Sequence, residues 1–354
     1  MKRIFTFIIF AFLALGCKER ETIAPEDALE AVRNEPLVDS ANHILTELES
    51  SVEFTEVIEF SGKYIFGGFN GYVITDQSLN LLDTYERNMI VYHLINYNDD
   101  FACVCANQGI FKVDQSLRTT KLIDLPCTDI EIDGSGQILF ISGLGELSQQ
   151  RQISANILAL DVDEQQFDFY SDPTDSIGEF LSQIEILSSG EIFTLSSNSS
   201  VFQYQDRNVI AKYSQEDVDF FPEDKSGLSS GYEIRAVGNE LYYTTPQWPR
   251  RLLRYDQDWE TVFDISFDSY ENTEEVPERD QEILFSTFNS LNSIDGQVVI
   301  GAQDGIIKVN PTTNEYSFIK DPNLPNQYVR KIYSDTSGDV IVIVAGNNII
   351  KYQN

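Results

Sequence analysis

One short segment combines the residue types that most often make binding contacts. Pro246–Arg251 reads PQWPRR and places the chain's adjacent arginine pair beside one of its two tryptophans. Trp and Arg are enriched at the centres of binding interfaces, Trp stacks well on other flat groups, and Arg pairs with carboxylates. We therefore identify Gln247, Trp248, Arg250 and Arg251 as candidate binding residues. The competing interpretation is that Trp248 packs its loop onto the fold and the arginines neutralise nearby acid.

A second candidate lies in another insertion and has the same kind of chemistry. Arg151 stands among Gln149, Gln150 and Gln152, so a cation and several amides are available together. We expect it to extend the binding surface formed by the first segment.

Motifs for catalysis and metal binding are absent from the sequence. The two histidines are His43 and His93, and His93 lies in a strand-like run typical of a structural histidine. No HExxH pattern, phosphate-binding glycine loop or GxSxG elbow occurs. Carboxylates that could hydrolyse glycosides as a pair are too numerous to single out. The acidic stretches 217–224 and 268–282 lack EF-hand spacing, so we expect solvated loops, no metal and no cofactor.

The N-terminus has the pattern of an exported protein. Lys2 and Arg3 precede an apolar run from Ile4 to Leu15, which is about the length of a signal-peptide core. The run ends in the sequence ALGC at Cys17, which resembles the lipobox of bacterial lipoproteins, with Ala14 where that family usually has Leu. The resemblance implies cleavage after residue 16 and a lipid on Cys17 that holds the protein at a membrane. The alternative is an ordinary secretory signal that contains a cysteine.

The residues after Cys17 suggest where the anchored protein is located. Lys18–Glu21 reads KERE and resembles the tag that follows the lipidated cysteine in surface-exposed lipoproteins of the Bacteroidota, although Arg20 departs from it. The resemblance implies the outer membrane and the cell surface, with its periplasmic face as the alternative. We expect a signal peptide over 1–16, a lipidated tether over 17–40 and one folded domain over 41–354.

The charge of the chain excludes one class of partner. It holds 57 Asp and Glu against 24 Lys and Arg, a formal net charge of −33. Such a surface repels phosphate backbones, so nucleic acid is excluded as a partner. We expect a monomeric domain with a solvated, acidic surface.

Three cysteines follow Cys17, at positions 103, 105 and 127. An odd number in an oxidising compartment leaves at least one thiol unpaired. On a strand, Cys103 and Cys105 share one face, so either could form a disulfide with Cys127 on a neighbouring strand. The alternative is that all three are small buried residues.

A repeated pattern after residue 50 predicts the fold. Each unit has a tight polar turn, an alternating apolar strand, a second turn and a short strand. The first apolar strand residues of the units are Tyr64, Phe101, Ile138, Ile192, Leu241, Val298 and Val340, 37 to 57 residues apart. These periods are typical of propeller blades, so we predict an all-β, seven-bladed β-propeller of mostly four-stranded antiparallel blades. An all-β solenoid is the competing fold, although its repeats are usually shorter.

Two details of the repeat predict how the propeller is completed and used. The last unit lacks its outermost strand, which we expect from 41–50 at the N-terminal side, although this segment also reads as a helix. Short turns join first to second strands, whereas insertions such as 143–155 and 245–251 fall on connections that emerge at the opposite end. We expect the binding surface on the face with the longer connections.

The last units carry a resemblance to a known repeat. Asp335, Gly338, the strand Val340–Val344 and Gly346 follow the pattern of propeller repeats in periplasmic sensor domains of two-component regulators. Quinoprotein-type repeats are similar at this level, and the tryptophans of both families are missing here. The resemblance covers most of 51–354 and implies the fold, not an activity.

These observations lead to two hypotheses of different classes. The first is a non-enzymatic envelope lipoprotein that recognises a protein or a glycan, or serves as a scaffold, through the loop-rich face. The second is a polysaccharide-acting surface enzyme, a lyase or hydrolase on the same fold.

Overall fold

The computed structural model describes most of the chain after its N-terminal region. The described residues are 43–143, 156–171, 179–197, 199–213, 233–244, 250–265, 276, 280–281, 283, 286–294, 296–303, 305–320, 328–345 and 347–353. All of its strands belong to one compact unit, Pro36–Asn354. No helix within the described part of the chain is long and apolar enough to span a membrane.

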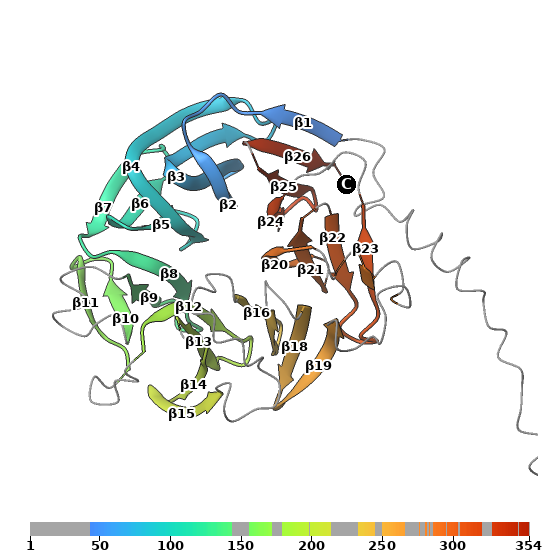
Figure 1. Cartoon of the computed structure of the whole chain (residues 1–354). Coiled ribbons are helices and arrows are strands. Elements are labelled where there is room, and N and C mark those ends of the chain that lie inside the picture. The colour runs from blue at the N-terminus through green and yellow to red at the C-terminus, as the bar shows by residue number, and fades with distance from the viewer. Residues whose placement is uncertain are drawn as a thin grey trace, which may run out of the picture. The chain divides into compact units, whose positions relative to one another are not determined.

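The described strands form six antiparallel sheets, which are arranged around a common centre within this unit (Figure 1). One sheet has six strands: β2 (Glu53–Phe60), β3 (Lys63–Asp76), β4 (Leu81–Asn96), β5 (Phe101–Ala106), β6 (Gly109–Asp114) and β7 (Thr119–Ile123). Each of the other five sheets has four strands.

The four-stranded sheets follow in chain order. The first two are β8 (Cys127–Ile132), β9 (Ile138–Ser142), β10 (Ile157–Asp161), β11 (Gln166–Phe169) and β12 (Leu181–Ile186), β13 (Ile192–Ser196), β14 (Val201–Gln205), β15 (Asn208–Tyr213). The next two are β16 (Glu233–Val237), β17 (Glu240–Thr244), β18 (Arg250–Asp256), β19 (Asp258–Ile265) and β20 (Phe288–Ile294), β21 (Gln297–Ala302), β22 (Gly305–Val309), β23 (Tyr316–Ile319). The last combines β24 (Val329–Ser334), β25 (Val340–Val344) and β26 (Asn348–Tyr352) with β1 (His43–Glu47).

The expected propeller of four-stranded antiparallel blades is confirmed, but the count of seven separate blades is wrong. The long strand β4 pairs with β3 through its first half, as in Tyr72 with Tyr85, and with β5 through its second half, as in Leu94 with Val104. The first two sequence repeats therefore share one continuous sheet, and six sheets result. Repeat counting could not anticipate this because β4 continues from one repeat into the next without a breaking residue.

The N-terminal strand completes the last sheet, as the sequence predicted. β1 pairs antiparallel with β26 over five residue pairs, from His43–Tyr352 to Glu47–Asn348. The segment 43–47 is therefore a strand and not a helix. Its alternating exposure, in which Ile44 is half-buried and Leu45 is exposed, matches an outer strand that packs through one face.

Apolar faces of neighbouring sheets form the core. One cluster joins Phe193 and Val201 of one sheet to Leu241 and Leu253 of the next, and Tyr242 packs with Leu291 across the following interface. Each sheet is covered on both sides in this way, which is why its central strands are apolar on both faces.

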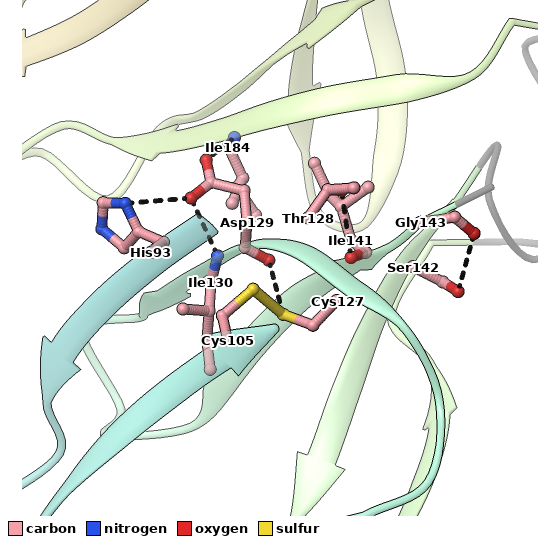
Figure 2. Close-up of a disulfide and its surroundings, with 10 residues drawn as sticks. All are labelled: His93, Cys105, Cys127, Thr128, Asp129, Ile130, Ile141, Ser142, Gly143 and Ile184. Atoms are coloured by element: carbon pink, nitrogen blue, oxygen red, sulfur yellow. Dashed lines mark hydrogen bonds and ion pairs between the residues drawn. A yellow bond between two sulfur atoms is a disulfide. The ribbon is translucent and has the colours of Figure 1, made fainter. Parts of the chain in front are cut away.

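A disulfide ties the first sheet to the second. Cys105 of β5 is bonded to Cys127 of β8, and Figure 2 shows this bond beside Asp129. Cys103 is a free thiol, fully buried, and burial raises its pKa to about 12. Of the alternatives that the sequence left open, the structure therefore has the Cys105–Cys127 pair.

Candidate functional site

We call the first strand of each sheet its inner strand (β2, β8, β12, β16, β20 and β24) and include the second half of β4, which pairs with β5. A cavity of about 820 Å³ opens at the end of the propeller where these inner strands begin. Its lining comes from β2, β4, β12, β16, β20 and β24, from Phe69 on β3 and Thr244 at the end of β17, and from Thr287 and Tyr328 just before β20 and β24. Glu233, the first residue of β16, is paired with Thr244, so the starts of inner strands and the ends of second strands lie at the same face. This is the face on which the sequence analysis expected the binding surface.

β-bulges in the inner strands direct residues to this cavity. The register skips one residue near the start of β2, β20 and β24, and one in the second half of β4, where its pairing with β5 begins. The skipped residues, Thr55, Tyr92, Asn289 and Arg330, all line the cavity. A bulge leaves its extra residue outside the ladder and re-aims the side chain, and bulges are frequent at functional sites.

β8 and β12, on the opposite side of the ring, have bulges at the corresponding position, but their skipped residues form hydrogen bonds within their own sheets. In β8 and β12 the skipped residues are Thr128 and Ser182. Thr128 Oγ1 donates to Ile141 O at 3.3 Å, and Ser182 Oγ donates to Leu195 O at 3.0 Å. Both hydroxyls therefore bond to their own sheet, and the cavity lies off-centre toward the strands that present larger side chains.

Aromatic side chains with unusual exposure line one side of the cavity. Phe69, Tyr92 and Tyr328 are 45%, 42% and 44% exposed. Large aromatic side chains are normally buried, so their clustering around one hollow indicates a surface that a ligand covers. We refer to these three residues as the aromatic rim.

Charged side chains also line the cavity: Glu56, Glu233, Arg330 and Lys331. Lys331 Nζ is 3.1 Å from Glu56 Oε1, and Arg330 forms an ion pair with Glu53. Glu233 also lines the cavity, and burial raises its pKa to about 7 although Lys331 and Arg235 oppose the shift. A fraction of Glu233 therefore carries a proton at neutral pH, and this residue can accept or donate one there.

Inner-strand side chains bond to the next sheet and keep the cavity walls in place. Gln183 Oε1 accepts from Ile234 N at 2.9 Å, and the Glu233 carboxylate accepts from the backbone N–H of Leu291. Inner strands are edge strands, so their outward N–H groups need partners from outside the ladder. These bonds supply such partners and fix the position of each inner strand relative to the next.

Asp129 on β8 makes the corresponding contact to β12 (Figure 2). Its carboxyl accepts from Ile184 N at 2.8 Å and lies 3.4 Å from His93 Nδ1. Burial lowers the pKa of His93 well below its ordinary value and raises that of Asp129 well above its own. Both groups therefore favour their uncharged forms, and His93 is a structural residue in this fold.

A second layer of charges lies further along the inner strands. Glu185 on β12 binds Arg235 Nη1 at 3.0 Å and accepts from Ala236 N at 2.9 Å. Glu185 and the other nearby carboxylates raise the pKa of Arg235 above its ordinary value. Burial, together with the charge of Glu185, raises the pKa of Glu131 to about 7. Acidic groups thus outnumber basic groups around the centre of the fold.

The candidate residues from the sequence lie only partly within the described residues. Arg250 and Arg251 begin β18, and Arg251 is half-buried. Gln247, Trp248, Arg151 and Cys17 lie outside the described residues. Thr244 lines the cavity and is followed in the chain by the segment 245–249.

Sequence reasoning missed the cavity residues, although a signal was present. Three inner strands read TDIEI, SQIEI and EIRAV, in which charged or amide residues alternate with apolar ones, and β2 contains TEVIEF, with two glutamates among apolar residues. Charged or amide side chains at several positions of a strand that must be buried are unusual. Such residues indicate a polar channel at the centre, and Glu56, Gln183 and Glu233 could have been found in this way.

No cluster of three or more His, Cys, Asp or Glu side chains in the described part of the chain is arranged to hold a metal ion. The candidate site is a cavity with an aromatic rim and a lining that contains two acidic and two basic side chains, Glu56, Glu233, Arg330 and Lys331.

Comparisons with known proteins give the fold. No family model matches this chain, and no curated protein sequence matches it. The solved extracellular domain of a putative hybrid two-component system from B. thetaiotaomicron is similar, with a TM-score of 0.62, 13% identity, 88% of this chain covered and 41% of that chain. The chain thus spans about two fifths of the length of that domain.

Two further structures with the same fold have different activities. A catalytically inactive virginiamycin B lyase from Staphylococcus aureus with quinupristin has a TM-score of 0.62 at 12% identity, covering 88% of this chain and 100% of that one. YCF48 bound to D1 peptide has a TM-score of 0.62 at 10% identity, covering 90% and 99%. Identities this low establish only the fold, and on this ground the described residues form a β-propeller of the kind found in the extracellular domains of Bacteroides two-component regulators.

Proposed function

We propose that this chain is a lipid-anchored recognition module of the bacterial envelope, which binds a protein or glycan ligand through the cavity face of the propeller. The observation that carries the proposal is the cavity of about 820 Å³ with three exposed aromatic residues at its rim. Ligand sites are concave, largely pre-formed, and combine apolar walls with a few polar groups. This cavity has each of those properties.

The candidate residues from the sequence extend this proposal. Arg250 and Arg251 follow the segment 245–249, which connects to the cavity residue Thr244. We propose that Trp248, Gln247 and the two arginines contact the part of a large ligand that extends beyond the cavity, with Arg151 as a further contact.

The comparisons support recognition at a propeller face without identifying the ligand. One similar structure contains a bound peptide, one contains quinupristin, and others are extracellular domains of two-component systems. Extracellular neighbours support an envelope location. The lipobox-like Cys17 supports lipid anchoring at the outer membrane and, with the KERE sequence, display at the cell surface.

In-cell photo-cross-linking tests this proposal. A photoreactive phenylalanine analogue replaces Tyr92 or Tyr328 at the rim, and replaces Glu164 in a control chain. Glu164 is exposed in the turn between β10 and β11, at the face opposite the cavity. We expect the rim positions to capture a defined partner or glycan and the control position to capture none. Capture only from Glu164, or equal capture from all three, would show that the cavity face is not the recognition surface.

A second function has one observation in its favour. Glu56 and Glu233 both line the cavity, and burial raises the pKa of Glu233 to about 7, so Glu233 can donate a proton at neutral pH. A lyase or hydrolase acting on polysaccharide would require such a pair. Turnover of a panel of acidic and neutral polysaccharides, abolished in Glu233→Gln, would support the enzyme, whereas binding without product supports the recognition module.

A further inference from the structure

Glu233 differs from Glu56, the other acidic residue of the cavity lining, in its lack of an ion-pair partner among the described residues. Glu56 is paired with Lys331, and the second base of the lining, Arg330, is paired with Glu53 outside it. Among the described residues, no Lys, Arg or His side chain lies within ion-pair distance of the Glu233 carboxylate, whose hydrogen bond comes from the backbone N–H of Leu291. The cavity therefore contains one carboxylate whose charge is not directly neutralised.

Hydroxyl groups without partners lie on the adjacent strand segment. Ser290 immediately precedes Leu291, so the bond from Leu291 to Glu233 holds the carboxylate close to this part of β20. Ser290 and Thr287 line the cavity, Ser290 is only 4% exposed, and neither hydroxyl has a hydrogen-bond partner among the described residues. Buried polar groups are normally satisfied, so these two hydroxyls, on the strand segment whose Leu291 N–H bonds to Glu233, are acceptors that a donor reaching this segment can satisfy.

The chemistry of this set of groups favours one class of partner. A carboxylate and two hydroxyls can all accept hydrogen bonds, and a primary ammonium group has three donors and no acceptor. A metal ion is the competing cation, but the described residues form no cluster of acidic, Cys and His side chains that could hold one. An organic cation requires only one carboxylate, as is found here.

The electrostatic environment attracts the same partner. Glu56 lies near enough to raise the pKa of Glu233, whereas the nearby bases, Lys331 and Arg235, are each already paired with another acid. The chain as a whole carries a net charge of −33. A cation entering the cavity therefore gains from both the local and the overall field.

We propose that the cavity binds a ligand that carries a primary ammonium group, held by the Glu233 carboxylate. Ser290 and Thr287 accept further hydrogen bonds from this group, and the apolar part of the ligand rests against the aromatic rim. This inference names the ligand chemistry of the cavity and rests on the proposed recognition function.

Protonation of Glu233 competes with such a ligand. Burial and the charge of Glu56 raise the pKa of Glu233 to about 7, while Lys331 and Arg235 oppose this shift. The ammonium group requires the ionised carboxylate, so its affinity falls as pH decreases from 8 to 6. A neutral ligand would show no such dependence.

Three matched probes test the inference by isothermal titration calorimetry on the full chain at pH 8. Phenethylamine, 2-phenylethanol and 3-phenylpropanoate share a ring and a short linker but carry a positive, zero and negative charge. We expect phenethylamine to bind at least about tenfold more tightly than the other two, since a hydrogen bond to a charged group contributes about 1.5–3 kcal/mol. Its affinity should also fall on acidification to pH 6.

Variants identify the group responsible. Glu233→Gln should remove the preference for phenethylamine while retaining the fold, because Gln183 already makes the equivalent bond to the next strand. Glu164→Gln removes one exposed charge from the opposite face and should leave all three affinities unchanged. Persistence of the preference in Glu233→Gln overturns the inference.

The outcomes separate this inference from the proposed function. Equal binding of all three probes, weakened in Tyr92→Ala, overturns the ammonium preference and leaves the cavity as the recognition site. Failure of every probe to bind overturns the ammonium inference, and the cross-linking experiment then decides the proposed function independently.

Discussion

Burial changes the protonation of carboxylates on the inner strands and therefore the stability of the fold. Glu131 on β8 shows how much stability is lost when such a carboxylate ionises. Burial and the charge of Glu185 raise its pKa to about 7, against an ordinary value of 4.5. The folded chain therefore holds a proton on Glu131 that the unfolded chain releases over this range. Stability contributed by the protonated form is present below about pH 4.5 and is lost as pH rises through 7.

This shift predicts a stabilising substitution. Glu131→Gln resembles the protonated side chain and removes the cost of burying the charge, so we expect a gain of about 1–3 kcal/mol in the free energy of unfolding at pH 8. The gain should shrink toward zero at pH 5. Urea denaturation at both pH values measures it, with Glu164→Gln as the surface control. A variant that is less stable than the wild type at pH 8 would contradict the assigned cause.

At the residue scale, the sequence predicted some of the site and missed its deepest part. The structural role expected for His93 agrees with its buried contact to Asp129. Trp248 and the arginines were conspicuous because of their residue types, whereas Glu233 was inconspicuous among 57 acidic residues. Its significance comes from its position in the cavity lining and from the lack of an ion-pair partner among the described residues, and neither property can be seen before the strands are assembled.

At the element scale, the inner strands depend on bonds that their own ladders cannot supply. Gln183 on β12 accepts from Ile234 N at 2.9 Å on β16. Gln183→Leu keeps a similar volume but leaves this N–H unsatisfied, so we expect a loss of about 1–3 kcal/mol in the free energy of unfolding. Gln183→Glu retains the acceptor and serves as the comparison in urea denaturation. Equal stability of Gln183→Leu and the wild type would show that the bond is dispensable.

The disulfide provides a second prediction at this scale. Cys105 and Cys127 are 22 residues apart and connect β5 to β8. A cross-link of this span stabilises by about 3 kcal/mol through the unfolded state, so reduction should lower the free energy of unfolding by about that amount. The double variant Cys105→Ala/Cys127→Ala should be insensitive to reductant. Equal sensitivity of the wild type and the double variant would mean that the bond is not the source of the effect.

Element-level patterns explain which parts of the fold were predictable. Alternation and turn residues located the second strands, and Tyr64, Phe101 and Val340 lie in β3, β5 and β25 as expected. Counting the strands of the last unit showed that its outermost strand was missing, and this led to the prediction that the N-terminal side supplies it, as β1 does. The six-stranded sheet was not predictable from these patterns, because the continuity of β4 depends on its pairing with two different neighbours.

At the scale of the whole molecule, the proposed lipid on Cys17 would hold the acidic propeller at a membrane surface, which suits the proposed recognition function. If Cys17 carries the lipid, Cys17→Ser should move the protein from the membrane fraction to the soluble fraction, because the acylated thiol is then removed. Fractionation followed by immunoblotting measures the change, and Cys103→Ala is the control. Retention of Cys17→Ser in the membrane fraction would exclude this mode of anchoring.

The central claim is that the cavity with its aromatic rim is the recognition site. Its most direct test is the affinity of the cross-linked partner or glycan for the double variant Tyr92→Ala/Tyr328→Ala, with Ile210→Ala as the control. Ile210 is a large apolar residue on β15 that is 51% exposed and lies outside the cavity lining. We predict at least about a tenfold loss of affinity for the rim variant, as for other aromatic residues at the centre of an interface, and no change for the control. Unchanged affinity in the rim variant would contradict the claim and place recognition elsewhere on the propeller.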